Sequence, residues 1–112
     1  MILIMGVLVI LNIFEVKEVS LPSFDDEDSM SNPDIVAHFV HPSGAEWWVV
    51  SGEEQLLVDN RKEFLLFGMA KIEFQELGLF TLSELLSVGA VFDDFWEVKG
   101  LYDVFPDLKQ NS

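Results

Sequence analysis

The sequence predicts an α+β fold: a small, mostly antiparallel sheet of about four strands, one short capped helix and a C-terminal helical turn. Three observations support this prediction. Residues 64–74 alternate with period two, residues 81–86 carry helix-capping chemistry, and residues 35–50 hold two apolar runs joined by a turn. The chain has 112 residues, half of them apolar and 10 of them Phe, so it can bury one core.

The first expected strands are residues 35–40, "IVAHFV", and residues 45–50, "AEWWVV", which are rich in β-branched and aromatic side chains. Between them, "HPSG" at 41–44 is typical of a turn. Pro42 presets its own φ angle, and Gly44 tolerates a positive one. These residues therefore predict an antiparallel hairpin.

This stretch also raises the question of a site, because it gathers both histidines of the chain, a glutamate and two tryptophans. A four-residue turn would pair His38 with Trp47, so these two side chains would share one face of the hairpin. Glu46 and Trp48 would then lie on the other face, and His41 would lie in the turn. Because the candidate ligands would not converge, we predict no metal, catalytic or cofactor-binding residues here.

Residues 51–63 are mostly polar and predict a loop, with a short apolar patch at 56–58 that would form either a brief strand or a turn. Residues 64–74, "FLLFGMAKIEF", are the strongest strand candidate. Their even positions are apolar throughout and should face the core, whereas the odd positions should emerge into solvent. Gly68 suggests a bulge or a close approach of a neighbouring strand.

The pattern changes period after Gly78, which we expect to interrupt the strand. Thr81 and Glu84 have the spacing of a capping box at the start of a short helix. Phe80 is placed to pack on Leu85 as a hydrophobic staple, and Gly89 should end the helix.

The C-terminal part reads as a last strand at 91–98, "VFDDFWEV", followed by a turn at 99–100 and a helical or irregular tail. Asp93 and Asp94 are adjacent, so on a strand they would point to opposite faces and could not work as a catalytic pair. We expect them to be solvated acids, with one of them pairing with Lys71 or Lys99.

The N-terminal residues 1–14 are almost wholly apolar, yet the run is shorter than the roughly 20 residues that span a bilayer. It also lacks the preceding positive charge and the cleavage site of a signal peptide. Met30 begins a sequence typical of a bacterial start, after four acids at 25–28. We therefore hypothesise that residues 1–29 are an over-called start, and that residues 30–112 form one globular domain.

Acidic residues number 20 against 6 basic ones, which gives a net charge of −14. This charge disfavours direct binding to nucleic acid or to anionic membranes and favours basic partners. The chain has no cysteine, which excludes disulfides, thiolate zinc sites and a cysteine nucleophile, and fits a cytoplasmic location.

Three segments carry a resemblance: "AHFVHPSGAEWWVVSGEE", "LLFGMAKIEFQELGLFTLSELLSV" and "FDDFWEVKGL". Together they resemble a bacterial family known only as the domain of unknown function numbered two-nine-five-eight, over residues 34–105. The most specific part is "ELGLFTLSEL" at 76–85. The resemblance implies a small bacterial protein of a kind often encoded on mobile elements, and it implies no activity or catalytic residues. The N-terminal extension departs from the family.

The tryptophans suggest where a partner could bind. Trp47 and Trp48 should point to opposite faces, so one can be core while the other lies either under a second layer or in an exposed patch. Trp96 poses the same question. Core packing is the default, and the candidate partner-binding residues are Trp47, Trp48, Trp96, Asp93 and Asp94.

These residues lead to three hypotheses. The first is a non-enzymatic protein-binding or regulatory module, which in its sharpest form imitates DNA and binds a basic, DNA-binding partner. The second is a small hydrolase or metal-assisted enzyme that uses His38 or His41 with nearby carboxylates, which requires a histidine and two acids within hydrogen-bond reach. The third is a homodimer joined along a free strand edge.

Overall fold

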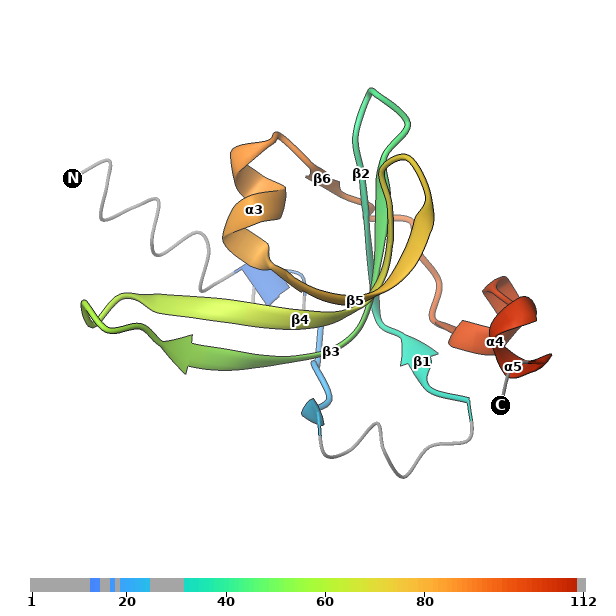
Figure 1. The fold of residues 1–112 in the computed structure, drawn as a ribbon, viewed down its shortest axis with the longest axis horizontal. Coiled ribbons are helices and arrows are strands. Elements are labelled where there is room, and N and C mark those ends of the chain that lie inside the picture. Colours follow the sequence, from blue (N-terminus) through green and yellow to red (C-terminus); the bar gives the residue numbers. More distant parts are fainter. Residues whose placement is uncertain (1–12, 15–16, 18, 25–31, 111–112) are drawn as a thin grey trace.

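A five-stranded antiparallel sheet and a separate two-stranded ribbon form the frame of the chain (Figure 1). The computed structural model describes residues 13–14, 17, 19–24 and 32–110. The α+β class is confirmed, with five strands in the main sheet where about four were expected. Within these residues, no helix combines the length and the apolar character needed to cross a membrane. The elements are β1 (Asp34–Ile35), β2 (Ala37–Val40), β3 (Glu46–Leu56), β4 (Lys62–Lys71), β5 (Gln75–Thr81), α3 (Leu82–Ser87), β6 (Val91–Phe92), β7 (Lys99–Gly100), α4 (Leu101–Val104) and α5 (Asp107–Gln110).

The main sheet has the strand order β5–β4–β3–β2–β6, with β3 at its centre. Its two faces are covered by different parts of the chain, and Figure 1 shows α3 and the α4–α5 pair on opposite sides of the central strands. We call the side under α3 the helix face. There Phe39, Trp47 and Leu66 of the sheet join Leu82 and Leu85 of α3 in one buried cluster.

The opposite side, which we call the C-terminal face, holds a second buried cluster. Trp48 lies at its centre, and the Phe105 ring meets the Trp48 ring edge-on at 4.9 Å between centroids. The β1–β7 ribbon and α4 hold this layer in place, because the Leu101 amide donates to the Pro33 carbonyl at 2.7 Å. The buried members of the cluster are Ile35, Trp48, Val50, Met69, Leu101 and Phe105.

The predicted helix start and stop are confirmed. The Thr81 hydroxyl accepts a hydrogen bond from the Glu84 amide at 3.2 Å, which caps α3. Phe80 and Leu85 lie in the same buried cluster, as a hydrophobic staple requires. Gly89 follows the helix with a φ of +84°, a conformation that glycine adopts without strain.

The predicted hairpin of β2 and β3 forms, but its predicted register is wrong by one residue. His38 pairs with Trp48 instead of Trp47, and Val40 pairs with Glu46. The cause is the turn: the His41 amide donates to the Ala45 carbonyl at 3.0 Å, so His41 lies opposite Ala45 and Val40 lies opposite Glu46. The pairing therefore differs by one residue from the predicted one, and such a shift exchanges the two faces of a strand.

Several predicted element boundaries are also wrong. β3 and β4 continue as a two-stranded ribbon well beyond the other strands, so residues 51–56 are strand where a loop was expected. Figure 1 shows this ribbon extending to one side of the molecule. Its outer part, residues 54–62, is exposed to solvent, which is why a mostly polar sequence suits it, whereas Ser51 and Gly52 are buried.

The strand predicted at 64–74 ends at Lys71, and residues 72–74 form a tight turn. β5 then returns antiparallel, so Gly78 does not interrupt the strand. Gly78 pairs with Gly68, and a strand at the edge of a sheet tolerates the missing side chain. The odd face of β4 was expected to emerge into solvent, but Met69 is buried because α4 and α5 cover it.

The strand predicted at 91–98 is reduced to Val91–Phe92. Asp93 ends it, because its carboxylate accepts a hydrogen bond from the Phe95 amide at 2.9 Å and turns the chain. Lys99 and Gly100, expected to form a turn, instead pair with β1 as the two-stranded ribbon. The expected helical turns of the C-terminal tail are present as α4 and α5.

The described residues of the N-terminal segment pack against the domain. Phe14 is buried and meets the ring of Phe39 edge-on at 6.2 Å and that of Phe64 at 5.9 Å. The Gly52 amide donates to the Pro22 carbonyl at 2.9 Å. Phe14 and Pro22 therefore add contacts to the sheet and its core on the helix face.

Phe14→Ala in the full chain should lower the free energy of unfolding by about 3 kcal/mol, because it opens a cavity between two packed rings. The form that begins at Met30 should lose at least as much. Urea unfolding of the three proteins measures both effects. Equal stability of the Met30 form and the full chain would contradict the packing of this segment.

Gly68 lies opposite a register shift between Val49 and Ser51, where β3 approaches β4 closely. A Cβ on Gly68 would lie 1.9 Å from the Trp48 carbonyl oxygen, so the backbone would have to move. Gly68→Ala should therefore cost about 3 kcal/mol or more of stability. Its cross-strand partner Gly78 has open space, and Gly78→Ala should change stability by less than about 0.5 kcal/mol. Thermal and urea unfolding that found equal effects for the two substitutions would overturn this assignment.

Candidate functional site

A histidine held between two carboxylates is the most connected polar group of the described residues. The observed register places His38 on the same face as Glu46 and Trp48. The His38 Nδ1 atom lies 2.8 Å from Asp93 Oδ2, and its Nε2 atom lies 3.0 Å from Glu46 Oε1. The prediction that Glu46 lies on the opposite face from His38 is therefore wrong.

Two indoles enclose the same imidazole ring. The His38 ring stacks on Trp48 with 5.3 Å between ring centroids and 22° between planes. Trp96 lies on it at 4.9 Å and 44°. The side chain of His38 is buried, so this cluster is a polar insertion in the C-terminal face.

The geometry limits what this histidine can do chemically. Ionised carboxylates only accept hydrogen bonds, so both bonds form together only when each ring nitrogen carries a proton. Both nitrogens of His38 are then occupied, and neither is free to take a proton from a substrate or to bind a metal. The cluster ties β2, β3 and the segment after β6 together, which is a structural role.

This arrangement lowers the pKa of the Asp93 carboxyl. Its hydrogen bond with His38 lowers the pKa of the Asp93 carboxyl below the ordinary 3.8, and the Phe95 amide contributes in the same direction against the opposing effect of burial. Asp94, which was considered with it, is exposed and pairs with Lys17 at 2.7 Å. The expected pairing of these acids with Lys71 or Lys99 is wrong, because both carboxylates find partners brought near by the fold.

His41, the second histidine, lies in the loop as expected and ties the loop to the end of α3. Its Nε2 atom lies 2.9 Å from the Val88 carbonyl oxygen, so this nitrogen donates. Its Nδ1 atom accepts from the Ser43 amide at 3.1 Å and lies 2.8 Å from the Ser43 hydroxyl. His38 and His41 have different partners, and among the residues that the structure describes no group of three or more His, Asp or Glu side chains is arranged to hold a metal ion.

The tryptophans do not provide an exposed patch. Trp47 is 5% exposed on the helix face and Trp48 is 7% exposed on the C-terminal face. Of the two alternatives for the second indole, the structure shows a second covering layer. Trp96 is partly buried, and its indole N–H donates to the Ile35 carbonyl at 2.8 Å. Trp48 is therefore covered by the C-terminal layer, whereas the small exposed part of Trp47 lines a cavity on the helix face.

Exposed large apolar side chains lie elsewhere, and four of them gather on the β4–β5 hairpin, while others such as Val58 and Phe95 lie outside it. We call Ile72, Phe74, Leu77 and Leu79 the hairpin surface; they are 70%, 73%, 43% and 62% exposed. The sequence pattern did not predict this surface, because it indicated a core-facing strand through residues 72–74 and an interruption of the strand at Gly78. The signal that could have found it was the repeat of Leu at 77 and 79, which is the spacing of one strand face.

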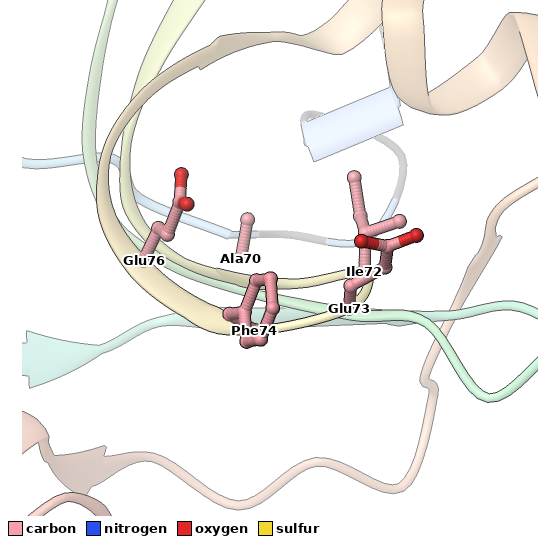
Figure 2. Close-up of a pocket in the computed structure, with 5 residues that line it drawn as sticks. All are labelled: Ala70, Ile72, Glu73, Phe74 and Glu76. Carbon is pink, nitrogen blue, oxygen red and sulfur yellow. The ribbon is translucent and has the colours of Figure 1, made fainter.

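The hairpin surface borders a hollow on the helix face. A cavity of about 260 Å³ is lined by Ala70, Ile72, Glu73, Phe74 and Glu76. Figure 2 shows Ala70, Ile72 and Glu76 projecting to the same side of the curved hairpin. Exposed apolar side chains and carboxylates therefore lie together at this end of the sheet.

Comparisons with known proteins find no matching family model, no matching curated protein and no matching solved structure.

The Asp93 carboxylate should give the fold an acid-sensitive contribution. The pKa of the Asp93 carboxyl is lower in the folded state than in the unfolded state, so the ionised carboxylate stabilises the fold when the pH lies above the unfolded-state pKa. This stabilisation is lost as the pH falls through the folded-state pKa. Asp93→Asn should cost about 1–2 kcal/mol at about pH 5, and the difference from wild type should shrink as the pH is lowered below the ordinary 3.8. Urea unfolding across this range measures it, with Asp94→Asn as the control because Asp94 does not contact His38. A difference that does not change with pH would contradict the assignment.

Proposed function

We propose that the chain is a non-enzymatic protein-binding module whose contact region is the hairpin surface. The observation that carries this proposal is the exposure of four large apolar side chains within residues 72–79. Single exposed apolar residues are ordinary, but a concentration of them on one element is typical of an interaction site. Full burial of one such side chain contributes about 1.5–3 kcal/mol of favourable free energy. Burial of these side chains against a partner would therefore stabilise a complex.

Charge supports a basic partner. Glu73 and Glu76 lie on the same hairpin, and the whole chain carries a net charge of −14. An acidic surface attracts basic proteins, DNA-binding proteins among them, and raises the rate of their association at low salt. Acidic residues beside exposed apolar ones give such an interface both affinity and selectivity.

An enzymatic function receives less support from the geometry. The histidine and two acids that a catalytic site requires do meet at His38. They meet with both ring nitrogens bonded and with the ring enclosed by indoles, whereas a general base needs a nitrogen within reach of a substrate proton. The hairpin surface, in contrast, can contact a partner without any change of the fold, because its side chains are already exposed.

The double substitution Leu77→Asn with Leu79→Asn should abolish partner binding without changing the fold, because both side chains are exposed. Immobilised protein is used to capture partners from a cell extract at low salt, and the retained proteins are compared between variants. The matched control is Val91→Asn with Val98→Asn, since both valines are 58% exposed and lie outside the hairpin.

A partner retained by wild type and by the control, but lost by the leucine variant, is the expected result. Equal retention by the leucine variant would overturn the proposal, and so would the absence of any specifically retained protein. Unfolding midpoints of all three proteins establish that the substitutions leave the fold intact.

A further inference from the structure

β5 is an edge strand of the main sheet. It has seven residues, and within the described part of the chain it pairs only with β4. Along an edge strand, alternate residues direct their N–H and C=O groups away from the sheet, where they can pair with another extended chain. β5 therefore offers a backbone template in addition to its side chains.

The side chains of β5 differ between its two faces. Leu77 and Leu79 lie on the C-terminal face, opposite Met69 and Phe67 of β4. Glu76 and Gly78 lie on the helix face. An added strand would thus meet apolar side chains on one face and an acidic residue on the other.

The helix face beside β5 is hollow because small residues line it. Ala70 and Gly78 leave space there, and a Cβ on Gly78 would meet no atom within 4 Å. A second cavity of about 210 Å³ adjoins the first and shares Ala70, Ile72 and Glu76 with it. The floor is apolar, with Trp47 and Phe80 among the lining residues of the second cavity.

Carboxylates surround this hollow. Glu73 and Glu76 line the first cavity, and Glu76 and Glu84 line the second. All three are exposed, and no salt bridge within the described residues involves them. A narrow apolar floor with carboxylates at its rim matches a long basic side chain, whose methylene stem is apolar and whose head is charged.

We propose that β5 captures an extended basic segment of a partner protein as a sixth strand of the sheet. The partner's alternate residues would be Lys or Arg on the helix face, with the stem over Ala70 and Gly78 and the charge beside Glu73 and Glu76. Its other residues would be apolar, packed on Leu77 and Leu79. This inference rests on the proposed function and specifies the partner's chemistry and its mode of binding.

A second copy of the chain is the competing occupant, and charge disfavours it. Two copies joined along β5 would bring two molecules of net charge −14 together and would place their Glu73 and Glu76 carboxylates near one shared edge. A basic strand neutralises these carboxylates instead. Light scattering over a range of concentrations distinguishes the two: a dimer that persists at low salt and is lost with Leu77→Asn and Leu79→Asn would overturn the basic-segment proposal.

The direct test uses synthetic peptides of the length of β5 and fluorescence anisotropy with the full chain. A peptide of alternating Lys and Val should bind at least about tenfold more tightly than its Glu and Val counterpart, and added salt should weaken it. Glu73→Gln with Glu76→Gln should reduce binding of the basic peptide, whereas Glu97→Gln, at an exposed acid outside the hairpin, should not. Equal binding of the acidic and basic peptides, or no binding of either, would overturn the charge assignment.

Strand addition has its own control. N-methylation of alternate peptide amides should abolish binding when the methylated set faces β5, and should have little effect when the other set is methylated. If the two differently methylated peptides bind equally well, the peptide does not add to β5 as a strand. Failure of the peptides together with a captured partner that depends on Leu77 and Leu79 would leave the proposed function standing and remove only this inference.

Discussion

The fold depends on a single constraint: β3 must place two adjacent tryptophans in two different cores. Trp47 fills the helix face and Trp48 fills the C-terminal face, and both are buried. Because side chains alternate along a strand, the two indoles point to opposite faces, and the observed register of β2 against β3 sets which β2 side chains join each of them. That register also brings His38 to Glu46 and to the face that Asp93 reaches, so the polar cluster is a consequence of the packing.

The two coverings of the sheet differ in extent, and this difference leaves β5 available. α3 follows β5 directly in sequence and packs on the helix face, whereas α4 and α5 pack over Trp48 on the C-terminal face. Neither covering buries Leu77 or Leu79, and β5 has a pairing partner on one side only within the described residues. The proposed binding region is thus the part of the sheet that the chain's own layers leave uncovered.

Features set by neighbouring residues could be predicted from the sequence, and features set by distant ones could not. The Thr81 cap, the glycine that ends α3 and the β2–β3 hairpin depend on residues within a few positions, and all three are present. The predicted hairpin register was wrong because His41 lies opposite Ala45 across the turn, where Gly44 has a φ of +96°, and the same residues also allow the four-residue turn that was expected.

The polar contacts of the candidate site join residues that are far apart in the sequence. Asp93 meets His38 across 55 residues, and Lys17 reaches Asp94 from the N-terminal segment. β5 was missed for another reason: Gly78 weakens the local strand pattern, whereas in the folded sheet the strand continues through it at the edge.

Hydrogen exchange of the free protein tests the central claim, the open edge of β5, most directly. If the edge is open, alternate amides of β5 should exchange rapidly, while the intervening amides and those of β3 and β4 at the centre of the sheet are protected. Uniform protection of all β5 amides at the level of β4 would mean that another segment or another molecule already covers this edge, and would contradict the account.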